Sequence, residues 1–193
     1  MPLDIPLRLR AEFATVVAIW DSRGTTRRVD SLLLSWVKYE KQLRRLFSYL
    51  VFQHPKISGD AIDQAVHAMA DHNKLYPETF VKGIAKLGIC TIPKLVGKPH
   101  AELVTEIARI KKYRNKLMHG QITGQRVSSP QIEKDVRLLV RWVGVLGDAA
   151  HAELGYDGIA RNTYSRAQTT SHLNTAGYPF GSASEFKEWI NRL

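Results

Sequence analysis

Cysteine is almost absent from this sequence of 193 residues, which contains a single one, Cys90. One thiol cannot form a disulfide within the chain, and it cannot build a zinc site that needs several cysteines. Long apolar runs are missing as well, since none approaches the roughly 20 residues of a membrane-spanning helix. We therefore expect a cytoplasmic protein with no membrane partner, no metal site and no disulfide framework.

Acidic residues are scarce relative to basic ones: 18 Asp and Glu stand against 28 Lys and Arg, which gives a net charge of +10. A domain this basic commonly binds a polyanion such as nucleic acid. The alternative is a basic surface that binds nothing. Hydrophobic residues make up 44% and charged residues 24% of the chain, as in ordinary globular proteins, so the composition excludes a wholly disordered chain.

The alternation of apolar and polar residues that marks β-strands is also missing, and apolar residues recur instead at helical spacing. The predicted helices cover roughly residues 11–20, 30–52, 60–72, 78–87, 99–119, 128–154 and 185–193, with 93–99 as a connector. The sequence therefore predicts an all-α, up-and-down helical bundle over residues 1–154. A C-terminal extension over 155–193, made of a polar strap and a short terminal helix, is expected to pack on the bundle.

Two charged residues stand on stripes that are predicted to face the core. Arg114 falls in the middle of the apolar face of the helix over 99–119, and Glu40 falls inside the apolar stripe of the helix over 30–52. Arg44 lies one turn after Glu40, at the i+4 spacing that allows the two side chains to pair. Because a buried charge needs a partner, we expect Glu40 and Arg114 to share one hydrogen-bonded network. Both an internal ion pair and a polar pocket between helices fit this spacing.

The helix over 99–119 ends in a short motif. Arg114 is followed directly by Asn115 and, after a gap of four residues, by His119 and the helix-stopping Gly120. This pattern resembles the catalytic motif of the HEPN superfamily, in which an arginine, a polar residue directly after it and a histidine four to six residues further on lie at a helix end in a small α-helical bundle. The resemblance covers about residues 30–154 in architecture.

This resemblance implies a metal-independent endoribonuclease that uses no cofactor. In RNA the 2′-OH can attack the adjacent phosphorus and leave a 2′,3′-cyclic phosphate, provided that one group moves protons and a cation stabilises the phosphorane. His119 would move protons, Arg114 would hold the phosphate, and Asn115 would orient the histidine or the substrate. Glu40, which resembles an acidic residue that many HEPN families carry on their first long helix, completes the expected catalytic set. The expected RNA-binding residues are Arg44, Arg109, Lys111, Lys112 and Lys116.

The resemblance also implies partners. Two protomers would form a homodimer in which both motifs line one cleft, and the protein would act on RNA in toxin–antitoxin or antiviral defence, with an antitoxin or defence-system protein as a further partner. Three alternatives stay open. The first alternative is a non-catalytic RNA-binding or protein-interaction module. The second is a HEPN-like protein that a nucleotidyltransferase antitoxin modifies, although Gln121 stands where members of that branch of the superfamily carry a tyrosine. His119 also has a purely structural interpretation, as a cap of the helix C-terminus.

Overall fold

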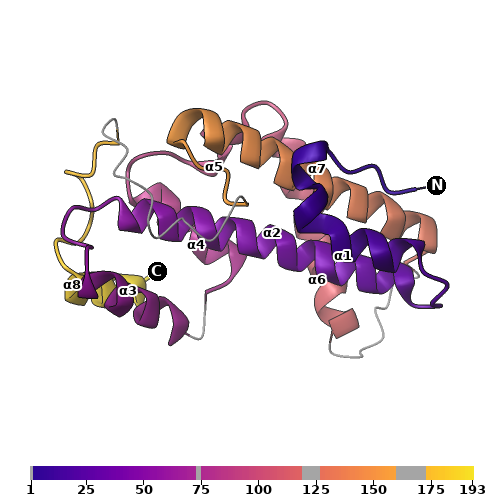
Figure 1. Ribbon diagram of the computed structural model, residues 1–193, viewed down its shortest axis with the longest axis horizontal. Coiled ribbons are helices and arrows are strands. Elements are labelled where there is room, and N and C mark those ends of the chain that lie inside the picture. Colours follow the sequence, from indigo (N-terminus) through magenta and orange to yellow (C-terminus); the bar gives the residue numbers. More distant parts are fainter. Residues whose placement is uncertain (1, 73–74, 119–126, 160–172) are drawn as a thin grey trace. The chain divides into compact units, whose positions relative to one another are not determined.

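The protein is all-helical in the computed structural model, which describes residues 2–72, 75–118, 127–159 and 173–193. These ranges contain a 3-10 turn, η1 (Leu7–Leu9), and the helices α1 (Arg10–Asp21), α2 (Arg27–Phe52), α3 (Asp60–Ala70), α4 (Pro77–Lys86), α5 (Ile92–Val96), α6 (His100–Met118), α7 (Ser129–Leu154) and α8 (Ala183–Ile190) (Figure 1). They contain no strand, and the all-α prediction is confirmed. None of the helices within these ranges is both long and apolar enough to cross a bilayer.

The segment over 93–99, predicted to be a connector, contains the short helix α5. The hydroxyl of Thr91 accepts a hydrogen bond from the backbone N–H of Lys94 at 3.3 Å, as an N-cap does. Pro93 stands in the first turn of α5, where a missing N–H removes no helical hydrogen bond. The two end residues of α5 are buried. The connector prediction is therefore wrong for residues 93–96, because a proline in the first turn is compatible with a helix.

The chain forms two compact units. Unit 1 consists of Met1–Tyr39 and Val96–Val145, and unit 2 consists of Glu40–Leu95 and Leu146–Leu193. Helices α2 and α7 both begin in unit 1 and end in unit 2. The expected division of the chain at residues 154 and 155 stays a prediction.

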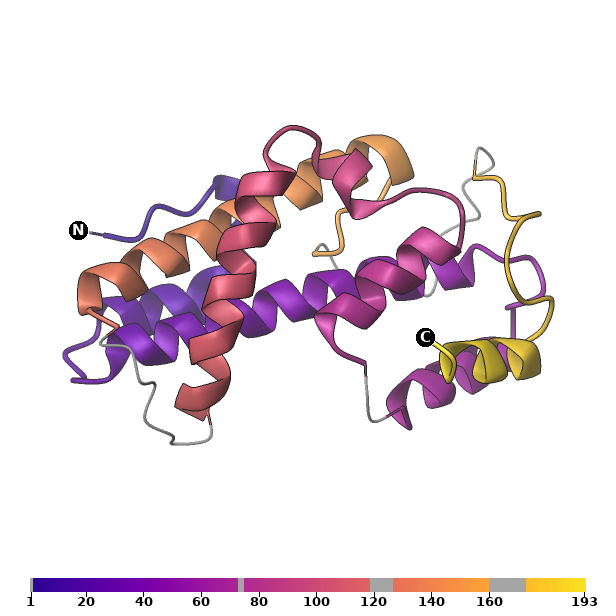
Figure 2. The ribbon, with the colours of Figure 1, turned by 180° about the vertical axis from the view of Figure 1, so that it is seen from behind.

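Unit 1 is a bundle of α1, α6 and the first parts of α2 and α7. Helices α1 and α2 run antiparallel, because Glu12 pairs with Lys38 at 3.0 Å while the guanidinium of Arg28 lies 3.8 Å from the centre of the Trp20 ring. Figure 2 shows α6 crossing the first parts of α2 and α7. Most members of the predicted apolar stripes are buried in this bundle, whereas Leu33 and Leu117 are half-buried. The buried members are Trp36, Leu103, Ile107, Ile110, Val136, Leu139, Val140 and Val143.

Unit 2 is built around a cluster of aromatic rings. The cluster draws on three segments that are far apart in the sequence, and its members are Phe47, Phe80, Phe180, Phe186 and Trp189. Helix α8 lies beside α3, as Figure 2 shows. Phe186, Trp189 and Ile190 recur at helical spacing in the sequence, and all three are buried on one face of α8.

The chain after α7 is fastened to the second part of α2. The hydroxyl of Tyr49 donates to the carbonyl of Leu154 at 2.8 Å, and the guanidinium of Arg45 donates to the carbonyl of Ile159 at 2.7 Å. At Gly158 the backbone has a φ of +74°, and a Cβ there would lie 2.9 Å from the carbonyl oxygen of Gln42. Glycine is therefore needed at position 158 both for its conformation and for the close approach of the two segments.

Candidate functional site

The last turns of α6 bring together two of the predicted catalytic residues, Arg114 and Asn115. The guanidinium carbon of Arg114 lies 4.6 Å from the centre of the Trp36 ring on α2, within the range of a cation–π contact. Its Nη1 donates a hydrogen bond to the side-chain oxygen of Asn115 at 2.7 Å. The guanidinium is thus held by a ring and an amide in unit 1, while its side chain remains half-exposed.

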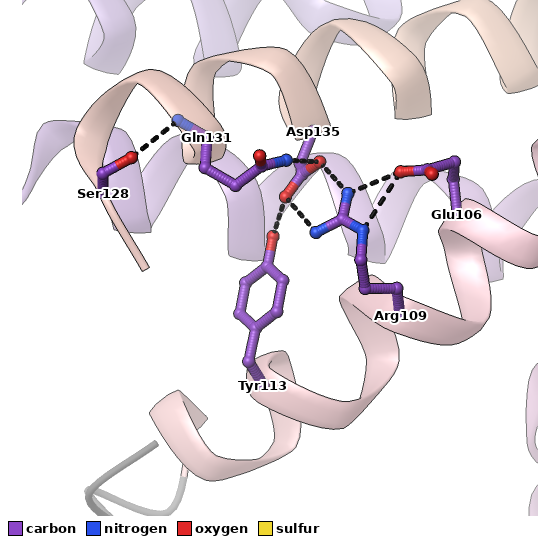
Figure 3. Close-up of polar contacts among 6 residues, drawn as sticks. All are labelled: Glu106, Arg109, Tyr113, Ser128, Gln131 and Asp135. Atoms are coloured by element: carbon purple, nitrogen blue, oxygen red, sulfur yellow. Dashed lines mark hydrogen bonds and ion pairs between the residues drawn. The ribbon is translucent and has the colours of Figure 1, made fainter. Parts of the chain in front are cut away.

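A second polar cluster joins α6 to α7 on the neighbouring face of α6 (Figure 3). At its centre is the carboxylate of Asp135, which is fully buried. Arg109 donates from Nη1 to Oδ2 at 3.2 Å and from Nη2 to Oδ1 of this carboxylate. The hydroxyl of Tyr113 donates to Oδ2, and the amide of Gln131 donates to Oδ1 at 2.9 Å. A second carboxylate, that of Glu106, accepts from Arg109 at 2.7 Å.

The cluster raises the pKa of two of its members, Arg109 and Tyr113. Hydrogen bonding to Asp135 raises the pKa of Arg109, which keeps the guanidinium charged at neutral pH. Burial, followed by the hydrogen bond to Asp135, raises the pKa of the Tyr113 hydroxyl, so that hydroxyl is a permanent donor. The structure therefore gives Arg109 a role that the sequence did not predict, as a tie between α6 and α7. Its contact with RNA stays a prediction.

Asp135 was missed at the sequence level, although a signal for it exists. It falls on the core-facing side of α7, between the buried residues Ile132 and Leu139. A charge inside an apolar stripe is the pattern that singled out Glu40 and Arg114. The same criterion, applied to α7, finds Asp135.

The end of α6 is strongly basic. Residues 109–118 contain five Lys and Arg and no Asp or Glu. Of the expected RNA-binding lysines, Lys112 and Lys116 are exposed and Lys111 is half-buried. The sequence of unit 1 contains sixteen Lys and Arg and eight Asp and Glu, a net charge of +8, whereas unit 2 contains twelve and ten, a net charge of +2. Most of the excess positive charge therefore belongs to the unit that contains Arg114.

The remaining predicted site residues lie elsewhere in the chain. Glu40, half-buried, and Arg44, exposed, belong to unit 2, where the guanidinium carbon of Arg44 is 5.7 Å from the centre of the Phe80 ring. A shared network of Glu40 and Arg114 stays a prediction. His119 lies outside the described residues, as does Gln121.

Two further features bear on the chemistry available. Within the described ranges, no group of three or more His, Cys, Asp or Glu side chains is placed to hold a metal ion. One hollow of unit 2, with a volume of about 1040 Å³, is lined by residues such as His54 and Tyr178, and its lining contains none of the predicted site residues. No protein-family model, curated protein or solved structure matches the chain.

Proposed function

We propose that this protein is a metal-independent endoribonuclease of HEPN type that cleaves single-stranded RNA. The observation that carries the proposal is the guanidinium of Arg114, which is held against Trp36 and Asn115 at the end of a basic helix. A planar guanidinium that is already oriented binds a phosphate with two parallel hydrogen bonds and loses little conformational freedom in doing so. The sequence places His119 directly after the last residue of α6.

The proposed reaction needs only groups of the protein and of the RNA. The 2′ oxygen attacks the adjacent phosphorus while His119 or its counterpart in a second protomer takes the 2′ proton. The bond from phosphorus to the 5′ oxygen then breaks, and that oxygen leaves with a proton from the second imidazole. Arg114 stabilises the negative charge that develops on the phosphorane. The hydrogen bond to Arg114 gives Asn115 a defined part, which is to orient the guanidinium.

The charge distribution supports RNA as the substrate. The +8 charge of unit 1 would attract a polyanion, and exposed Lys112 and Lys116 extend the positive charge along α6 on either side of Arg114. The resemblance to HEPN proteins supports a homodimer that acts as a toxin or as an effector of antiviral defence.

Cleavage of a labelled single-stranded RNA in excess EDTA tests the proposal. We expect products that end in a 2′,3′-cyclic phosphate. Since general acid–base catalysis contributes about 10²- to 10⁴-fold, His119→Ala should lose activity by a factor in that range. Arg114→Ala and Arg114→Lys should both lose most of the cleavage activity. Alanine has no charge, and the ammonium group of lysine cannot make the two parallel hydrogen bonds of a planar guanidinium. Lys98→Ala, which removes an exposed cation of unit 1 outside the proposed site, is the matched control and should retain wild-type activity.

Two outcomes would contradict the proposal. The first is a folded His119→Ala protein that cuts RNA at the wild-type rate. The second is an activity that EDTA abolishes and magnesium restores. A wild-type protein that binds RNA with a steep salt dependence and cuts none would instead favour the non-catalytic RNA-binding module.

A further inference from the structure

The carboxylate of Asp135 on α7 accepts hydrogen bonds from two successive turns of α6. Arg109 and Tyr113 are four residues apart, so both project from one face of α6 toward the same carboxylate (Figure 3). Each oxygen of Asp135 accepts two hydrogen bonds, one of them from Arg109. Gln131, one turn earlier on α7, holds the carboxylate from its own helix. The carboxylate thus has one orientation in which all four bonds are made.

These hydrogen bonds restrict rotation of α6 about its own axis. A guanidinium bound to both oxygens of a carboxylate must lie nearly in its plane, which fixes direction as well as distance. The hydroxyl of Tyr113 adds a second fixed point one turn further along α6. Because Arg114 is the next residue after Tyr113, the rotation of this turn decides where Arg114 points.

We propose that Asp135 is a positioning residue for Arg114. Acting through Arg109 and Tyr113, it sets the rotation of the last turns of α6 and so keeps the Arg114 guanidinium on the Trp36 ring, in the direction that a phosphate would approach. The geometric part of this inference stands on the contacts alone. Its catalytic consequence rests on the proposed function.

A second ion pair between the same helices offers a matched control. Arg141 of α7 donates to Glu102 of α6 at 3.2 Å, two turns before Arg109, and both side chains are largely exposed. This pair also joins α6 to α7, but it does so near the start of α6 and in water, where an ion pair contributes little. Glu102→Gln should therefore leave the last turns of α6 in place.

The test measures the position of Arg114 and the rate of cleavage in the same variants. The ring current of Trp36 shifts the NMR signal of the Arg114 side-chain N–H. This signal is assigned by its absence from the spectrum of Arg114→Lys. In Asp135→Asn an amide replaces one carboxylate oxygen and faces the donors of Arg109, so we expect the Arg114 signal to move toward its unfolded-state position. We expect kcat for RNA to fall by about 10- to 100-fold with KM nearly unchanged, because small misplacements of a catalytic group cost rates of this order.

Tyr113→Phe is the second test variant, and it replaces Asp135→Asn if that variant does not fold. It removes one hydrogen bond and keeps the ring, and it should move the Arg114 signal and lower kcat in the same direction by a smaller factor. Glu102→Gln should change neither. An Arg114 signal and a kcat that stay at wild-type values in the folded variants would overturn the inference, and so would a fall in rate that only follows the unfolded fraction. If the wild-type protein cuts no RNA while Asp135→Asn still moves the Arg114 signal, the proposed function fails and the positioning role holds.

Discussion

The guanidinium of Arg114 rests on Trp36, a residue that is itself only 2% exposed. The Trp36 ring meets Tyr39 edge-on, with ring centres 5.2 Å apart, and Tyr39 meets Trp142 in the same way at 5.9 Å. These edge-on contacts restrict rotation of the Trp36 ring. The half-buried side chain of Arg114 therefore rests on a ring that is itself packed into the core of unit 1.

Replacements of Trp36 distinguish the contact of its ring with Arg114 from its packing in the core. Trp36→Leu and Trp36→Phe both remove buried volume and should destabilise the bundle, but only phenylalanine keeps a ring under the guanidinium. A cation–π contact is worth about 0.5–2 kcal/mol, so under the proposed function RNA cleavage by Trp36→Leu should be roughly 2- to 30-fold slower than by Trp36→Phe. The rates are compared at a temperature at which both variants are folded.

Trp20 provides the control for this comparison, because it carries the guanidinium of Arg28 at 3.8 Å in the same unit. Trp20→Leu and Trp20→Phe should cut RNA at equal rates. Equal rates in the Trp36 pair as well would show that the ring does not support Arg114 in catalysis.

Local periodicity was sufficient to predict the long helices and their buried faces. The apolar stripe of α7 is an example, since all of its members are buried. They are Ile132, Val136, Leu139, Val140, Val143, Leu146 and Ala150. Periodicity depends only on neighbours within one helix, so it needs no knowledge of the partner. Periodicity also identified Arg114 as a charged residue on an apolar helix face. In the structure its guanidinium contacts the Trp36 ring and the side chain of Asn115.

Contacts between distant segments were beyond this kind of inference. On α2, Arg45 is buried, and its guanidinium donates a hydrogen bond to the carbonyl of Ile159. A backbone carbonyl 114 positions away leaves no mark in the spacing of α2. The same holds for Trp36, which an apolar stripe assigns to the core without showing that a cation lies on it.

Gly83 and Gly144 should respond to alanine in opposite ways. Both stand inside helices, where alanine is favoured over glycine by about 1 kcal/mol. At Gly83, however, a Cβ would lie 2.6 Å from a ring carbon of Phe47, which is fully buried in the aromatic cluster of unit 2. At Gly144 the nearest atom is 3.5 Å away, in ordinary contact. We expect Gly83→Ala to destabilise by about 1–3 kcal/mol and Gly144→Ala to stabilise by up to about 1 kcal/mol.

Urea unfolding of the two glycine variants beside the wild type measures this difference. A Gly83→Ala protein as stable as Gly144→Ala would mean that Phe47 can move, and that the aromatic cluster is less tightly packed than its ring distances indicate.

Cys90 should react slowly with alkylating reagents. Burial raises the pKa of its thiol to about 11, with a further contribution from Glu153 and an opposing one from Lys94. Because only the thiolate reacts, the rate should rise about tenfold per pH unit from pH 7 to pH 10 without levelling off. Glu153→Gln should lower the pKa of the thiol and speed alkylation at a given pH, whereas Glu188→Gln, at an exposed position of unit 2, should not. Mass spectrometry of the alkylated fraction gives the rate, and a plateau below pH 9 would contradict this account.

The stability of unit 2 should depend on the protonation of His54. Its ring stacks on Tyr178 and packs against Phe180, with both pairs of ring centres 5.5 Å apart, and its Nδ1 accepts the backbone N–H of Lys56. Burial lowers the pKa of His54, the charge of Lys56 lowers it further, and Glu185 opposes them. The folded state therefore binds this proton less readily than the unfolded state, in which the pKa is about 6.5.

The sign of the effect follows from linkage. A histidine with a lowered pKa contributes stability above about pH 6.5, and this contribution is lost as the pH falls through the folded-state pKa. The free energy of unfolding of the wild type should accordingly decrease from pH 7 to pH 5. The decrease should be smaller for His54→Phe, which keeps a ring beside Tyr178 and Phe180. Lys56→Gln should weaken the pH dependence and Glu185→Gln should strengthen it, since the two charges act in opposite directions on the pKa of His54. Urea titrations at both pH values measure the change, with His151→Phe, at an exposed position of α7, as the control. If His54→Phe and the wild type lose the same stability over this interval, another group is responsible for the acid sensitivity.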